Sequence, residues 1–100
     1  MEMRVGDKNI GTMTMLNEGN HIKIDSADIL PEFQGKGYGK ELYMRAIEYA
    51  RDQGIGEVRS GRPTSEDAAR VWKSLGASSF EDQGYTRYKL DVSDWKRPPR

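Results

Sequence analysis

The segment LPEFQGKGYGKEL, residues 30–42, limits the possible folds of this chain more than any other stretch. Gly35, Gly37 and Gly39 occupy every second position, and lysines stand between and after them. Glycine is used where the backbone turns tightly or approaches another group closely. The segment stands where a strand should give way to a helix. Three glycines beside positive charge at such a turn indicate that the group approached is a phosphate.

The residues before the glycines have the period of β-strands. Residues 3–16 contain two short strand-like segments around a Gly-Asp-Lys-Asn turn, which predicts a hairpin. The apolar positions of a third strand, 21–30, change parity midway along it. A β-bulge near Asp25 and Ser26 would produce this change. The alternative is a strand buried on both faces at one end. Pro31 cannot donate a hydrogen bond within a sheet and should end the strand.

Two helices are predicted after the glycines. The first covers residues 38–53 and ends at Gly54, a residue favoured after helix C-termini. Thr64 is expected to cap the second, with Asp67 as its capping-box partner, and Gly76 to end it. The apolar positions of the two helices are Leu42, Tyr43, Ala46, Ile47 and Ala50, then Ala68, Val71, Trp72 and Leu75.

Two more strands are predicted, at 57–60 and 85–92. The resulting order is strand, strand, strand, helix, strand, helix, strand, which indicates an α/β fold with a mixed sheet. The polar, proline-containing end, residues 93–100, is expected to be a loose tail. No repeat or linker divides the sequence, so we expect a single domain over residues 1–100.

Composition excludes several classes of protein. Sixteen Lys and Arg balance sixteen Asp and Glu, so there is no overall basic field and no direct nucleic-acid contact is expected. The chain has no cysteine and one histidine, which excludes thiolate and multi-histidine metal sites. No apolar run approaches about 18 residues, and the first residues do not form an apolar signal region. We therefore expect no membrane contact and a cytoplasmic location.

Three phosphate-binding motifs can be compared with the glycine segment. A dinucleotide fingerprint would need glycine where Lys40 stands, and a P-loop would need glycine at Gln34 and a hydroxyl residue at Glu41, so neither fits. The stretch QGKGYG, 34–39, instead resembles the Q/R-x-x-G-x-G/A signature of the GCN5-related N-acetyltransferases (GNAT family). ILPEF before it and RVWKSLGA in the second helix resemble the lead-in and closing phrases of that family, so the resemblance covers about residues 3 to 80.

The resemblance implies a GNAT fold, with a mixed, mostly antiparallel sheet and two main helices, and acetyl-coenzyme A (acetyl-CoA) as co-substrate. Backbone amides of the glycine loop and the first helical turn would hold its diphosphate, helped by the roughly half positive charge of the helix N-terminus. Its pantetheine arm would lie in a wedge between strands 21–30 and 57–60. The residues implied to bind it are Ile29, Leu30, Gln34, Gly35, Lys36, Gly37, Tyr38, Gly39, Lys40, Ser65 and Trp72.

The implied reaction is direct attack of a primary amine on the acetyl group in a ternary complex. By position in the family, the backbone N–H of Ile29, or that of Leu30, would stabilise the oxyanion. An alkyl amine has a pKa near 10.4 and arrives protonated, so a general base is expected. Asp28 is the first choice because it lies close to the wedge. The alternatives, each of which can also be a solvated strand residue, are His21, Asp25 and Glu32.

The sequence departs from the family pattern at two points. A tyrosine often protonates the leaving thiolate, but Trp72 occupies the matching position and its indole N–H is a poor acid. Tyr85 is the candidate substitute, with Tyr88 or water as alternatives. The family also usually begins with another strand and two helices, which wall the acceptor site, whereas a hairpin alone precedes residue 21 in this short form. An open cleft, a docked protein tail or the second subunit of a homodimer would each account for this.

Two functions are therefore weighed. The first is an N-acetyltransferase acting on an amine-bearing small molecule or protein. The alternative is a non-catalytic CoA-binding or protein-interaction module with the same fold, which Trp72 and the short N-terminal part favour.

Overall fold

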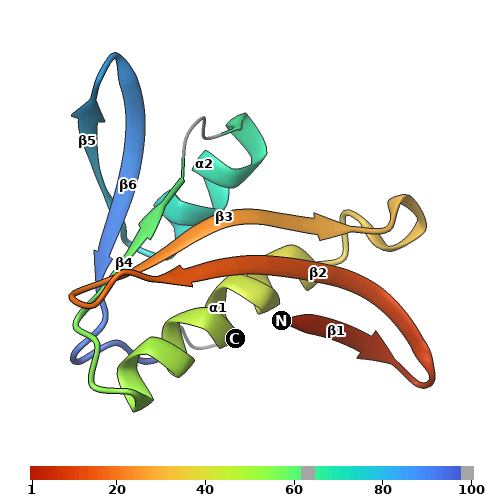
Figure 1. The fold of residues 1–100 in the computed structure, drawn as a ribbon. Coiled ribbons are helices and arrows are strands. Elements are labelled where there is room, and N and C mark those ends of the chain that lie inside the picture. The colour runs from red at the N-terminus through yellow and green to blue at the C-terminus, as the bar shows by residue number, and fades with distance from the viewer. Residues whose placement is uncertain (62–64, 98–100) are drawn as a thin grey trace.

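A six-stranded sheet and two helices make up the protein. The computed structural model describes residues 1–61 and 65–97, and Figure 1 shows its elements in chain order. These are β1 (Glu2–Val5), β2 (Lys8–Asn17), β3 (Ile22–Ile29), the 3₁₀ helix η1 (Pro31–Phe33), α1 (Tyr38–Asp52), β4 (Glu57–Ser60), α2 (Glu66–Ser74), β5 (Ser78–Asp82) and β6 (Tyr85–Asp91).

The strand order in the sheet is β1-β2-β3-β4-β6-β5. Within the described residues, β3 and β4 form a parallel pair and the other neighbouring pairs are antiparallel. The chain leaves β3, forms α1 and returns in β4, which is the crossover that parallel neighbours require. The sheet is therefore mixed and mostly antiparallel with two main helices, which confirms the predicted fold class.

The predicted β-bulge lies in β3. Thr14 of β2 is opposite Ser26 and Met15 is opposite Ile24, so Asp25 has no partner in the β2 ladder. The side chains of β3 that face the core change parity across this residue, from the buried Ile22 and Ile24 to the half-buried Ala27 and Ile29, and no part of the strand is buried on both faces. The bulge, and not two-sided burial, therefore explains the change of phase. β3 ends at Ile29, just before Pro31, as expected.

One hydrophobic core joins the sheet to both helices. α1 packs against β2, β3 and β4 through the side chains predicted from its periodicity, and Leu42, Ala46 and Ile47 are fully buried. Trp72 of α2 is 1% exposed, and its ring meets the ring of Tyr43 nearly edge-on, with centroids 5.3 Å apart. This contact fixes α2 relative to α1.

The ends of the helices agree with the sequence at one point and differ at another. After α1, the amide of Gly54 donates to Arg51 O and that of Ile55 donates to Ala50 O, so Gly54, with a φ of 76°, completes a Schellman motif. The cap of α2 is Ser65, whose Oγ accepts a hydrogen bond from the Ala68 amide. Thr64, the expected cap, lies outside the described residues.

The structure contains a strand that the sequence did not predict. β5 runs antiparallel to β6 and forms the edge of the sheet. Its sequence, SSFED, holds one large apolar residue, so it lacks the alternation that marked the other strands. The available signal was the turn: Gln83 and Gly84 have φ values of 52° and 85°, and such a two-residue turn joins hairpin strands.

Residues 93–97, part of the expected tail, lie against α1. Trp95 packs on the hydrophobic core, and Arg51 Nη1 donates a hydrogen bond of 2.9 Å to its carbonyl. Arg97 then pairs with Glu41 at 2.7 Å and with Glu48 at 2.6 Å. The rest of the expected tail, residues 98–100, lies outside the described residues.

Candidate active site

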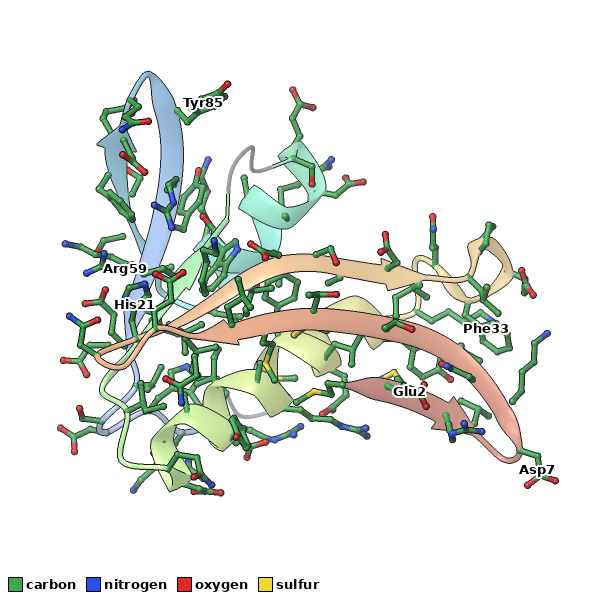
Figure 2. All side chains as sticks on the ribbon, in the orientation of Figure 1. Glu2, Asp7, His21, Phe33, Arg59 and Tyr85 are labelled. Atoms are coloured by element: carbon green, nitrogen blue, oxygen red, sulfur yellow. The ribbon has the colours of Figure 1, made fainter. Side chains whose placement is uncertain are left out.

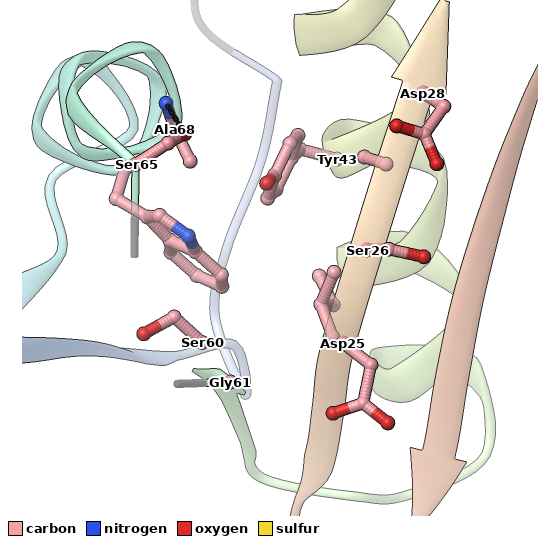
Figure 3. Close-up of a pocket in the computed structure, with 11 residues that line it drawn as sticks. Asp25, Ser26, Asp28, Tyr43, Ser60, Gly61, Ser65 and Ala68 are labelled. Carbon is pink, nitrogen blue, oxygen red and sulfur yellow. Dashed lines mark hydrogen bonds between the residues drawn. The ribbon is translucent and has the colours of Figure 1, made fainter. Parts of the chain in front are cut away.

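A cavity opens where β3 and β4 stop pairing. The last pair is Ile24 opposite Ser60, after which the Gly61 amide donates a hydrogen bond of 2.8 Å to Ile24 O. A Cβ on Gly61 would lie 3.1 Å from both Ile24 O and Asp25 Oδ1, so glycine allows β4 to end directly against the bulge. Beyond this point lies a space of about 200 Å³, which we call the wedge cavity (Figure 3).

Side chains from four elements reach the wedge cavity. β3 and α2 face each other across it, the end of β4 closes it, and α1 contributes a tyrosine (Figure 3). The polar and aromatic residues among those that line it are Asp25, Asp28, Tyr43, Ser60, Ser65 and Trp72. The structure thus brings together Asp28, Ser65 and Trp72, which the sequence analysis had selected from three separate segments.

The backbone amides of β3 alternate between β2 and the wedge. The Leu30 amide donates a hydrogen bond of 2.9 Å to Ile10 O on the β2 side. Successive residues of a strand direct their amides to opposite edges, so the Ile29 amide points toward the wedge. Gln34 Nε2 donates to the Ile29 carbonyl at 2.9 Å. The Leu30 amide is therefore already paired within the sheet, whereas the Ile29 amide faces the edge of β3 that β4 leaves unpaired.

The glycine loop presents a row of backbone donors. Gly35 and Gly37 have φ values of 78° and 85°, in the region that favours glycine. Gly37 is the N-cap of α1, no side chain caps the helix, and the first helical hydrogen bond is from the Glu41 amide to Gly37 O. Within the described part of the chain, the amides of residues 35–40 have no recorded hydrogen-bond partner.

The amide row begins one residue later than expected, because the Gln34 amide donates to Pro31 O at 3.3 Å. The Gln34 side chain, as described above, bonds within the protein too, so this residue shapes the loop. The Lys36 ammonium lies 5.8 Å from the ring centroid of Phe33, at the rim. Free amides, a helix N-terminus and nearby lysines are the features from which anion-binding sites are built.

The four candidate bases differ in their surroundings. Asp28 is exposed and lines the wedge cavity. Asp25 lines it as well, but lies 3.4 Å from the ammonium of Lys23. His21 is buried at the other end of β3, where its Nδ1 is 2.7 Å from Asn20 Oδ1 (Figure 2). Glu32 pairs with a lysine of β2 at 3.2 Å. Of the two carboxylates at the wedge, Asp28 is thus the one without an ion pair to any residue in the ranges 1–61 and 65–97.

Comparison with known proteins decides the family. The model of the acetyltransferase (GNAT) family matches residues 3–77, which include the glycine loop and all four elements that line the wedge cavity. This chain belongs to the GNAT family. No curated protein matches the chain significantly in sequence.

Solved structures share the fold of this GNAT chain. A Bacillus subtilis acetyltransferase in complex with CoA is 21% identical, with a TM-score of 0.74 over 88% of this chain and 72% of that one. The ribosomal-protein-S18-alanine N-acetyltransferase from Escherichia coli is 14% identical, with a TM-score of 0.79 over 99% and 72%. A putative acetyltransferase from Salmonella typhimurium with its cofactor acetyl-CoA is 22% identical, with a TM-score of 0.73 over 96% and 65%. At 100 residues, this chain is short relative to these neighbours.

Two of the predicted GNAT residues have different surroundings from those expected. Ser65 Oγ is at the cavity but already accepts the capping hydrogen bond from Ala68. Tyr85 is 48% exposed and lies at the tip of the β5–β6 hairpin, away from the wedge cavity (Figure 2). The structure therefore does not bring the candidate acid to the other site residues.

None of the helices in residues 1–61 and 65–97 is both long and apolar enough to cross a membrane.

Sequence analysis missed one residue of the site. Tyr43 fitted the apolar face of α1 and was assigned to the core, but it also lines the wedge cavity. Burial, and then the negative charge of Asp28, raise the pKa of its hydroxyl above the ordinary tyrosine value. The available signal was chemical: a tyrosine stands among aliphatic residues on a face that needs no hydroxyl.

Proposed function

We propose that this chain is an N-acetyltransferase that moves an acetyl group from acetyl-CoA to a primary amine by direct attack in a ternary complex. The observation that supports this most is the presence of two features on either side of the end of β3: the free amides of residues 35–40 that follow it, and the wedge cavity beside its unpaired edge. The first suits a diphosphate, and the second suits an extended arm that ends in a thioester. The acceptor would be an amine on a small molecule or a protein.

The glycine loop would hold the diphosphate end of acetyl-CoA. Its donors are the amides of residues 35–40, reinforced by the dipole of α1, and Lys36 and Lys40 add positive charge. The backbone of β3 beyond the bulge directs the amides of Ala27 and Ile29 toward the wedge, where a pantetheine arm could pair with them. Trp72 would form an apolar wall beside the arm.

The bound acetyl-CoA would supply an activated acyl group, and the chain's residues would assist its transfer. The Ile29 amide would donate a hydrogen bond to the carbonyl oxygen as negative charge develops there, an effect of about 10²–10³ in rate for donors of this kind. Asp28 would accept the proton of the attacking amine, directly or through water, because it lies at the cavity and is exposed to solvent. Tyr85 has no role in this proposal because it lies outside the cavity.

Two measurements test the proposal. Thermal unfolding with CoA at 100 times its dissociation constant should show about 2.7 kcal/mol of added stability. Release of free thiol from acetyl-CoA should then require an added amine, drawn from a panel of small amines and lysine-containing peptides. Stabilisation without thiol release for any amine would favour the non-catalytic CoA-binding module, which the tryptophan at position 72 also favours. No stabilisation by CoA would contradict both functions.

A further inference from the structure

The hydroxyl of Tyr43 is a polar group in the wedge cavity for which the fold shows no use. Tyr43 is 7% exposed, and no hydrogen bond to its hydroxyl is recorded in the described part of the chain. No fully buried side-chain nitrogen or oxygen among the described residues lacks a partner, so this oxygen must reach open space. Figure 3 shows it directed into the cavity, between α2 and β3.

Packing alone does not account for a tyrosine at this position. The neighbours on the same face of α1 are aliphatic and fully buried, Leu42, Ala46 and Ile47 among them. A phenylalanine would make the same ring contact with Trp72, so the hydroxyl adds nothing to the packing that the structure shows. The hydroxyl is therefore placed for a ligand in the cavity.

The position of Trp72 indicates what the hydroxyl does. The resemblance that identified the glycine loop places a tyrosine where Trp72 stands, and an indole cannot replace its acidic hydroxyl. The ring of Tyr43 lies 5.3 Å from that of Trp72, centroid to centroid, at the same cavity. A hydroxyl from α1 can thus reach a region that the side chain at position 72 leaves without one.

We propose that Tyr43 is a catalytic residue that donates a hydrogen bond to the sulfur of acetyl-CoA as the carbon–sulfur bond breaks. This inference rests on the proposed function. The amine nitrogen forms the new bond to the carbonyl carbon, and sulfur leaves with the electron pair of the broken bond. Asp28 or water takes the proton lost by the amine, and the thiolate later takes a proton from water. Tyr43 keeps its own proton throughout.

The surroundings of Tyr43 favour a donor that keeps its proton. Burial and the charge of Asp28 both oppose formation of a tyrosinate. A thiol has a pKa near 8.5, so a departing thiolate is a weaker base than a tyrosinate and does not remove this proton. The Tyr43 hydroxyl can therefore stabilise negative charge on sulfur across the neutral and mildly alkaline range.

Steady-state kinetics of Tyr43→Phe test the proposal, with Tyr49→Phe as the matched control. Tyr49 is on the same helix but is 44% exposed and does not line the cavity. A hydrogen bond to a charged group corresponds to roughly a 10- to 100-fold effect. We expect kcat to fall by that factor in Tyr43→Phe, with little change in KM for acetyl-CoA, and no change in Tyr49→Phe. Full kcat in Tyr43→Phe, or a rise in KM alone, would overturn the role at sulfur.

Binding measurements provide a second readout that does not depend on turnover. The quantity to measure is the ratio of the CoA affinity of wild type to that of Tyr43→Phe. This ratio should increase about tenfold as the pH rises past the thiol pKa, about 8.5, because the Tyr43 hydroxyl then donates its hydrogen bond to a thiolate. Affinity for acetyl-CoA should not show this difference. Equal pH dependence of CoA binding in the two proteins would contradict the proposal. If wild-type protein binds no CoA at all, the proposed function fails first, and this inference fails with it.

A rescue experiment separates a chemical role from a structural one. The first double variant combines Tyr43→Phe with Trp72→Tyr, which places a hydroxyl at the neighbouring position. The second combines Tyr43→Phe with Trp72→Phe, which removes a similar side-chain volume but adds no hydroxyl. The first double variant should recover part of the lost kcat and the second should not, while both unfold at similar temperatures. Equal activity of the two double variants would count against a need for a hydroxyl at this end of the cavity.

Discussion

Gly37→Ala should weaken CoA binding far more than its effect on stability explains. Gly37 is the N-cap of α1 and has a φ of 85°, where an L-residue is strained, yet an added Cβ would meet no atom within 4 Å. The expected destabilisation is therefore backbone strain alone, about 1–2 kcal/mol. For a domain of this size each kcal/mol lowers Tm by roughly 4–8 °C. Relief of this strain requires a change in the backbone angles of Gly37, which would move the neighbouring amides of the loop.

Thermal unfolding with and without CoA measures both effects. CoA at 100 times the wild-type dissociation constant should add about 2.7 kcal/mol to wild type. We expect Gly37→Ala to retain less than about 1 kcal/mol of this, which corresponds to roughly 20-fold weaker binding.

Gly84→Ala is the matched control for Gly37→Ala. Gly84 also has a φ of 85° and open space around its missing Cβ, but it lies in the turn between β5 and β6. It should lose similar stability and keep the whole CoA effect. A full CoA effect in Gly37→Ala would refute the assignment of the diphosphate to this loop. Equal loss of the effect in both variants would show that general destabilisation, and not the loop, weakens binding.

Three further predictions concern stability and can be measured by denaturant unfolding. Hydrogen bonds from Arg97 lower the pKa of Glu41 and of Glu48 in the folded protein. The contribution of these ion pairs to the free energy of unfolding is therefore fully present above the carboxyl pKa of the unfolded chain, near 4.3, and is lost as the pH falls through the lower pKa values of the folded protein. Arg97→Met should cost less than about 1 kcal/mol at pH 7, and the cost should shrink between pH 5 and 3; a constant cost would contradict the ion pairs. Ser65→Ala removes the cap of α2 and should cost about 1 kcal/mol. Ile47→Ala empties a fully buried site and should cost about 2–5 kcal/mol, so a neutral result would contradict the packing of α1.

The features that the sequence predicted are those that depend on local pattern. The period of α1, the glycine at its C-terminus and the parity change in β3 are each visible within about ten residues, and each is present in the structure. β5 was missed because its alternation is too weak to detect and its stability depends on pairing with β6, a contact that forms only in the folded sheet.

The details of the site depended on register and orientation, which local pattern does not give. Whether Ile29 or Leu30 directs its amide to the wedge follows from the pairing of β3 with β2, so the sequence left both open. Helical periodicity placed Tyr43 on the buried face of α1, but it could not show that the hydroxyl at the end of that ring reaches a cavity. Tyr85 was selected for its chemistry alone, and the hairpin places it elsewhere.

The bulge at Asp25 connects these local features to the candidate site. One extra residue in β3 shifts the side-chain alternation, which returns Ala27 and Ile29 to the side of the core. In a strand the direction of the amide alternates together with the side chain, so the same shift directs the Ile29 amide to the wedge. Pairing with β4 also ends at this point, with Gly61 against the bulge. A single irregularity thus opens the cavity, supplies its candidate oxyanion donor and keeps the apolar side chains in the core.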